Sequence, residues 1–167
     1  MVIYRKLSKK DAEQFFEMMT YLDGETDFMM YEPGERLRSS GPEELAENIQ
    51  SGIASGDFLI AAFDDGKVVG YLWAERGRYH RISHMAYIVT GVLEAYRGRG
   101  IGTELFRQVE EWAQRESMAR LELTVQCRNE RAVYLYQKRG FCIEGIKKKS
   151  LIVNGEFADE YYMAKLL

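Results

Sequence analysis

The chain has 167 residues, of which 46% are hydrophobic and 13% aromatic, enough to fill the core of one domain without disulfides. A formal net charge of -3 argues against a general binder of nucleic acid or of anionic membranes. Two cysteines and two histidines form neither a disulfide framework nor a metal-ligand spacing, so we expect no metal and a reducing, cytoplasmic setting.

The N-terminal third is predicted to hold a strand, two helices and a long loop. Residues 2–7 alternate as a strand does, and their charges interrupt the apolar stretch that a signal peptide needs. Ser8 is a good N-cap for a helix whose apolar stripe ends at Gly24. Residues 25–41 show no period and predict a loop, and a second helix begins at Pro42.

The rest of the chain alternates between strand and helix patterns. The predicted elements are a hairpin over 58–74, a strand over 82–93, helices over 101–117 and 130–138, and strands over 121–125, 141–149 and 157–166. No repeat or linker interrupts them. We therefore expect residues 1–167 to form one α/β domain, with a mixed sheet of about seven strands and four helices.

A glycine-rich turn joins the 82–93 strand to the following helix. Gly98, Gly100 and Gly102 leave the backbone open to a ligand, and free amides at a helix start favour an anion. Arg97 and Arg99 add local positive charge. The spacing fits neither the P-loop nor the dinucleotide fingerprint. The turn predicts diphosphate binding, and the alternative is a plain helix start with solvent-facing arginines.

These residues resemble motif A of the GNAT superfamily of N-acetyltransferases, Arg/Gln-x-x-Gly-x-Gly/Ala, through Arg97, Gly100 and Gly102. Residues 129–141 resemble the motif B of that family, and the predicted element order agrees with its fold. In that fold the strand around Val92 splays from its neighbour and the cofactor lies in the gap. The resemblance implies an acetyl-CoA-dependent N-acetyltransferase.

The resemblance also implies roles for individual residues. The backbone N–H of Val92 would stabilise the oxyanion, Asn129 would hold the pantetheine arm, and Tyr136 would be the general acid that protonates the leaving thiolate. The implied acetyl-CoA contacts are Gly91, Val92, Arg97, Gly98, Arg99, Gly100, Ile101, Gly102, Thr103, Asn129 and Tyr136.

The general base is less clearly indicated. A glutamate found in some family members corresponds to Thr124, which cannot remove a proton. Glu122 lies on the same strand face and is our candidate, acting directly or through water, although an exposed or ion-paired carboxylate is the more common arrangement at such a position. Glu75 and His84 are weaker candidates, and a covalent acetyl-enzyme on Cys127 is disfavoured.

The resemblance further implies that the acceptor is a primary amine and that the 25–41 loop and the final hairpin shape its entrance. Acidic and aromatic residues in that loop suggest a cationic amine. The C-terminal segment resembles the branch that includes phosphinothricin-type and ribosomal-protein N-terminal acetyltransferases, which act on small amines and on protein termini. Alternatives are a non-catalytic acyl-CoA-binding or sensor domain, and a protein-interaction module. Dimers are common among members of the family, so the resemblance leaves both a monomer and a homodimer as alternatives for this chain.

Overall fold

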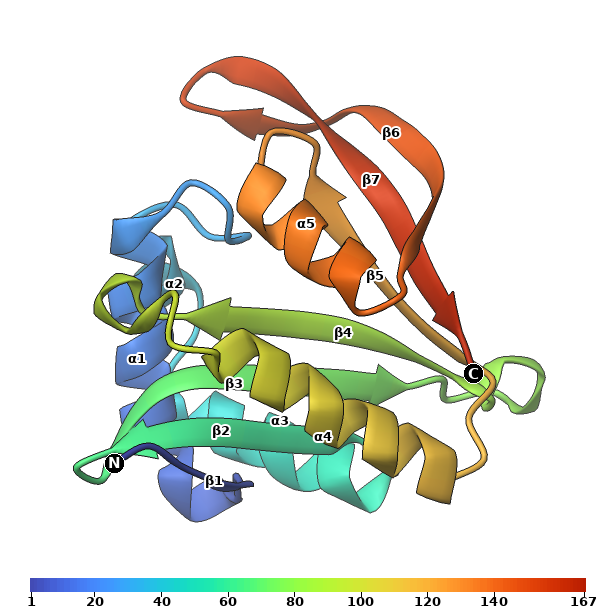
Figure 1. The fold of residues 1–167 in the computed structure, drawn as a ribbon. Coiled ribbons are helices and arrows are strands. Elements are labelled where there is room, and N and C mark those ends of the chain that lie inside the picture. The colour runs from blue at the N-terminus through green and yellow to red at the C-terminus, as the bar shows by residue number, and fades with distance from the viewer.

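A computed structural model describes residues 1–167 and confirms a mixed α/β fold with a seven-stranded sheet (Figure 1). The elements are β1 (Ile3–Lys6), α1 (Ala12–Glu25), α2 (Glu35–Ser39), α3 (Pro42–Ala54), β2 (Phe58–Asp64), β3 (Lys67–Arg76), β4 (Met85–Val92), α4 (Ile101–Arg115), β5 (Arg120–Gln126), α5 (Glu130–Lys138), β6 (Cys142–Val153) and β7 (Glu156–Leu166). The strand order is β1-β2-β3-β4-β5-β7-β6. No helix combines the length and the apolar character needed to cross a membrane.

The structure corrects three boundaries. The expected loop over 25–41 contains α2, a helix of five residues that is too short to produce a recognisable period. Helix α1 continues through Gly24 to Glu25. Strand β4 begins at Met85 because residues 80–82 form a 3-10 turn. The number of α-helices is therefore five instead of four.

Helices cover both faces of the sheet. The larger core cluster has 21 buried residues, to which α4 contributes Leu105, Val109, Trp112 and Ala113 among others. The smaller cluster has 12 buried residues and lies under α1 and α3. Residues that alternate along each strand face opposite clusters: Ala86 and Ile88 of β4 belong to the larger one, and Val89 packs on the smaller one.

Strands β4 and β5 separate part-way along their length. They form the only parallel pair of strands in the sheet. In this pair Met85 lies opposite Arg120, Ala86 opposite Leu121 and Tyr87 opposite Glu122. Beyond Tyr87 and Glu122 both strands continue without pairing to each other. We call this point the fork. It confirms the expected splay, visible in Figure 1 as the divergence of β4 from β5 and β7.

Gly77 offers a test of packing at the end of the hairpin formed by β3 and β4. A Cβ built on Gly77 would overlap the backbone carbonyl of Ile82, which cannot rotate away as a side chain could. Overpacking of this kind typically costs about 1–3 kcal/mol. We expect Gly77→Ala to lower the free energy of unfolding by about 3 kcal/mol, measured by urea denaturation.

The matched control is Gly24→Ala. Gly24 lies within α1 and nothing would contact its Cβ, so alanine should raise the free energy of unfolding by about 0.5–1 kcal/mol. A Gly77→Ala protein as stable as the parent would show that the 77–85 connection adapts freely.

Candidate functional site

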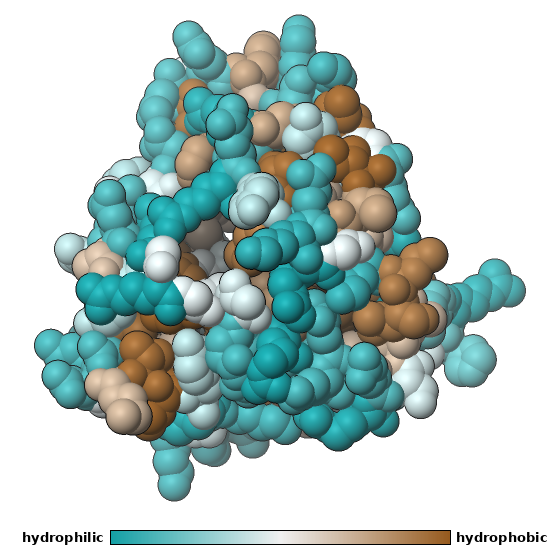
Figure 2. All heavy atoms as spheres, viewed as in Figure 1, coloured by the Kyte–Doolittle hydropathy of each residue, from teal (hydrophilic) through white to brown (hydrophobic).

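A cavity of about 600 Å³ lies beside the fork, walled by β4, the start of α4, α5 and the end of α1. Figure 2 shows an opening on the face of the molecule that is turned to the viewer, and hydrophilic side chains lie around it. Every residue predicted to contact acetyl-CoA lines the cavity except Arg99. Those present are Gly91, Val92, Arg97, Gly98, Gly100, Ile101, Gly102, Thr103, Asn129 and Tyr136.

The glycine turn presents a row of free backbone donors to this cavity. The N–H groups of the six residues 98–103 donate no hydrogen bond within the protein. Gly98 and Gly100 have φ values of 77° and 82°, the left-handed region that glycine adopts without strain. Six convergent amides at the start of a 15-residue helix form a strong site for an anion.

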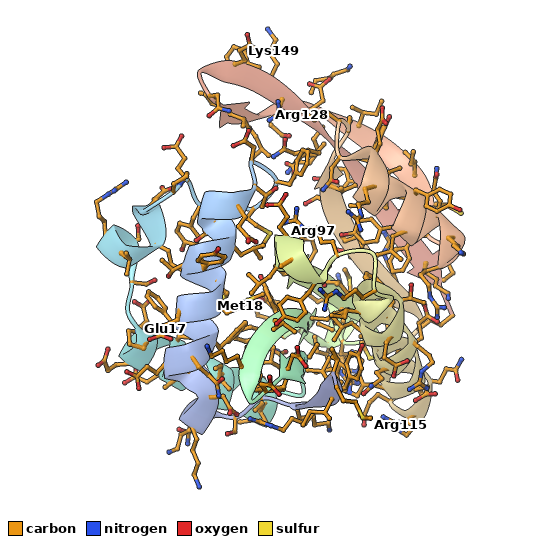
Figure 3. All side chains as sticks on the ribbon, turned by 60° about the vertical axis from the view of Figure 1, so that its left-hand side comes forward. Glu17, Met18, Arg97, Arg115, Arg128 and Lys149 are labelled. Atoms are coloured by element: carbon orange, nitrogen blue, oxygen red, sulfur yellow. The ribbon has the colours of Figure 1, made fainter.

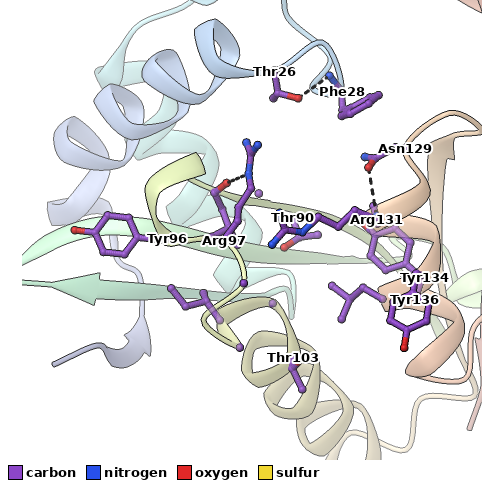
Figure 4. A pocket seen from close by; sticks show the side chains of 18 of the residues that line it. Thr26, Phe28, Thr90, Tyr96, Arg97, Thr103, Asn129, Arg131, Tyr134 and Tyr136 are labelled. Atoms are coloured by element: carbon purple, nitrogen blue, oxygen red, sulfur yellow. Dashed lines mark hydrogen bonds between the residues drawn. The ribbon is translucent and has the colours of Figure 1, made fainter.

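The edge of β4 that faces the fork is also free. Leu93 N–H donates to Val69 O of β3, and directions alternate along a strand, so the backbone groups of Val92 point away from β3 toward the gap. Arg97 Nε donates to Val92 O at 3.0 Å (Figure 4). The carbonyl is thus held by Arg97, while the Val92 N–H is directed into the gap.

The two arginines of the turn differ in placement. Arg97 lies in the cavity lining, between α1 and the C-terminal strands (Figure 3). The Arg99 guanidinium instead stacks over the Tyr96 ring, 4.9 Å from its centroid. The structure therefore keeps Arg99 near the turn but outside the cavity lining, because cation–π stacking holds it against Tyr96.

Two cations of α5 complete the site and were missed by sequence reasoning. Arg131 and Lys138 line the cavity, and Arg131 reaches toward the turn from the opposite wall (Figure 4). Its guanidinium would lie 3.4 Å from a Cβ on Gly98. Arg139, the residue that follows α5, in contrast pairs with Glu110. The seven-residue spacing of Arg131 and Lys138 on one helix face was the available signal.

Asn129 and Gly102 position α5 against α4. Asn129 Oδ1 accepts a hydrogen bond from Ala132 N–H at 3.3 Å, which caps the helix start. A Cβ on Gly102 would come within 3.0 Å of Leu135, so glycine allows the two helices to approach closely. This approach is what brings Arg131 over the turn.

Tyr136 is 8% exposed and packs against Phe106 and Phe141, with ring centroids 5.4 and 6.2 Å away. Burial, followed by the nearby phenols of Tyr87 and Tyr71, raises the pKa of Tyr136 above its ordinary value. The phenol is therefore protonated at neutral pH. Its side chain lines the cavity, where a proton donor could reach a bound ligand.

The structure does not bring Glu122 into the cavity. Its Oε2 accepts from Arg120 Nε at 2.7 Å, and Arg120 also pairs with Glu144. Arg120 precedes Glu122 by two residues on the same strand face, a signal that the sequence already held. Glu75, a weaker candidate for the base, has its pKa raised by burial and then by Asp57. Burial also raises the pKa of Cys127, which keeps this residue a thiol and disfavours it as a nucleophile.

A second cavity of about 240 Å³ adjoins the first, because Thr26 and Met29 line both. It is enclosed by residues 26–33, by Gln126 and by residues 151–154 at the tip of the hairpin formed by β6 and β7. Asp27 ties these parts together: its carboxylate accepts from Asn154 Nδ2 at 3.0 Å, and its carbonyl from Gln126 Nε2 at 2.8 Å. The expected acceptor loop and final hairpin thus do enclose a common space.

Comparisons with known proteins agree with this geometry. The Acetyltransferase (GNAT) family model matches residues 22–141. The chain is 38% identical over 111 residues to the L-amino acid N-acetyltransferase AaaT of Escherichia coli K12, covering 64% of this chain and 67% of that protein. It is 35% identical over 107 residues to the N-alpha-acetyltransferase RimI of Mycobacterium tuberculosis, covering 64% of each. A GNAT-family acetyltransferase structure from Streptococcus pneumoniae superposes with a TM-score of 0.94 at 30% identity, covering both chains completely.

Proposed function

The chain belongs to the acetyltransferase (GNAT) family, whose members use acetyl-CoA, and from this premise we propose that it transfers the acetyl group of acetyl-CoA to a primary amine. The observation that carries the proposal is the run of free amides over 98–103, in a turn whose glycines line the same cavity as the unpaired guanidinium of Arg131. We further propose that residues 1–167 act as a single domain.

The cavity suits coenzyme A in its donors and in its shape. Backbone amides and guanidinium groups are the ligands that bind a diphosphate most strongly, and Arg97, Arg131 and Lys138 line the same cavity as the turn. The unpaired edge of β4 suits the amide groups of a pantetheine arm, which can pair with it as a further strand would. Tyr136 lies in the same lining, on the opposite side of the gap from β4.

Each residue of the proposed site has a chemical task. Acetyl-CoA supplies an acetyl group activated as a thioester. The Val92 N–H, directed into the gap, donates to the carbonyl oxygen on which negative charge develops during attack. Tyr136 donates its proton to the departing sulfur. With Glu122 engaged by Arg120, the amine loses its proton through water.

The second cavity is the proposed acceptor site. It meets the cofactor cavity at Thr26 and Met29, so an amine held there is directed at the fork. The names of two similar proteins specify L-amino acids and N-alpha acetylation, and both point to a primary α-amine. We propose this group as the acceptor for the chain.

Isothermal titration calorimetry with coenzyme A, followed by thiol release from acetyl-CoA with a panel of amino acids and short peptides, tests this function. We expect binding of coenzyme A and turnover with at least one α-amine. Binding without turnover on any amine would favour an acyl-CoA sensor. The absence of any heat with coenzyme A would refute the proposal.

A further inference from the structure

Two hydroxyl groups meet across the fork. Tyr87 is the last residue of β4 that pairs with β5, and Thr124 lies two residues beyond its partner Glu122. Tyr87 Oη and Thr124 Oγ1 are 2.7 Å apart. A side-chain hydrogen bond therefore joins the two strands just where their backbone hydrogen bonds have ended.

This hydrogen bond lies on the acceptor face of the sheet. Ile88 and Leu123, the next residues in the alternation, are buried in the core cluster under α4, so Tyr87 and Thr124 face the other way. Gln126 follows Thr124 by two residues on the same face and lines the second cavity. Tyr136 belongs to the core cluster on the α4 side, so the Tyr136 ring and the two hydroxyls approach the fork from opposite faces of the sheet.

The hydrogen bond between Tyr87 and Thr124 is suited to fixing the distance between β4 and β5. Both residues are half-buried, so water competes for their hydroxyls less than at an open surface. A hydroxyl–hydroxyl distance of 2.7 Å is at the optimum for such bonds. Thr124 stands where some family members carry a glutamate, and its side chain has no carboxylate with which to accept a proton. The pair can hold the strands in place but cannot remove a proton.

We propose that the Tyr87–Thr124 hydrogen bond is a positioning element for acetyl transfer. It sets how far β4 and β5 separate on the acceptor side and thereby places the attacking amine relative to the Val92 N–H. Rate falls steeply when reacting groups are misplaced by as little as about 1 Å. The inference rests on the proposed function.

The test compares Tyr87→Phe, Thr124→Val, their combination and Thr124→Ser. We expect each single variant to lower kcat roughly tenfold at saturating amine, with the Kd for coenzyme A and the Tm close to those of the parent. Because both single variants break the same hydrogen bond, the kcat of the double variant should be no lower than that of either single variant. Thr124→Ser keeps the hydroxyl and should restore kcat. Tyr79→Phe, at a residue 77% exposed, controls for loss of a tyrosine hydroxyl.

Three results would overturn the inference while leaving the proposed function intact: single variants with parental kcat, a double variant whose loss is the product of the two singles, or no recovery with Thr124→Ser. Parallel losses of kcat, coenzyme A affinity and Tm would also overturn it, because they indicate a purely structural contact. A parent that releases no thiol with any amine refutes the proposed function and the inference together.

Discussion

Tyr136→Phe is expected to lower turnover by roughly 10²-fold or more while leaving coenzyme A affinity nearly unchanged. The substitution keeps the ring that packs on Phe106 and Phe141 and removes only the hydroxyl. That hydroxyl makes no hydrogen bond within the protein, so little stability should be lost. Steady-state kinetics with calorimetry separates the two effects.

The pH profile provides an independent check on this role. Because burial raises the pKa of Tyr136, its acid form persists through neutral pH, and any alkaline loss of kcat due to this group should fall above the ordinary phenol value of about 10. Tyr21→Phe, at a residue 64% exposed on α1, is the matched control. A Tyr136→Phe enzyme with the turnover of the parent removes Tyr136 from the mechanism.

Charge reversal at Arg97 and Arg131 together is expected to weaken coenzyme A binding on the order of 10³-fold. A hydrogen bond to a charged group contributes about 1.5–3 kcal/mol. Both arginines line the cavity, and the guanidinium of Arg131 lies 3.4 Å from where a Cβ on Gly98 would be. Titration calorimetry of Arg97→Glu/Arg131→Glu measures the loss. The affinity that remains should depend less on salt than that of the parent.

The matched control reverses two exposed lysines that do not line the cavity, Lys10→Glu and Lys67→Glu, and changes the net charge by the same amount. Pantetheine, which lacks phosphate, should bind all variants alike. Arg99→Glu should have a smaller effect, because Arg99 stacks on Tyr96 outside the lining. Equal coenzyme A affinity in the double variant and the parent would show that the turn does not hold a diphosphate.

Much of the site could be predicted because it is local in sequence. The strand end, the glycines and the helix start occupy one continuous segment, so their spacing alone indicates an anion site. Glu122 shows the limit of this reasoning: alternation predicts which face a side chain takes, yet its ion pair with Arg120 removes it from the cavity. Arg131 and Lys138 went unassigned because their role depends on α5 packing over α4.

The sequence by itself determined the order of the seven strands and of the four longer helices, the position of the glycine-rich turn and the family. The elements follow from the short-range periodicity of apolar residues, and the turn follows from the spacing of its glycines within one continuous segment. Only the tertiary structure decided which cations face the turn, where β4 and β5 part, and that Tyr87 meets Thr124 across the fork. Such contacts join residues 30 or more positions apart, and their distances depend on how whole elements pack, which no local pattern encodes.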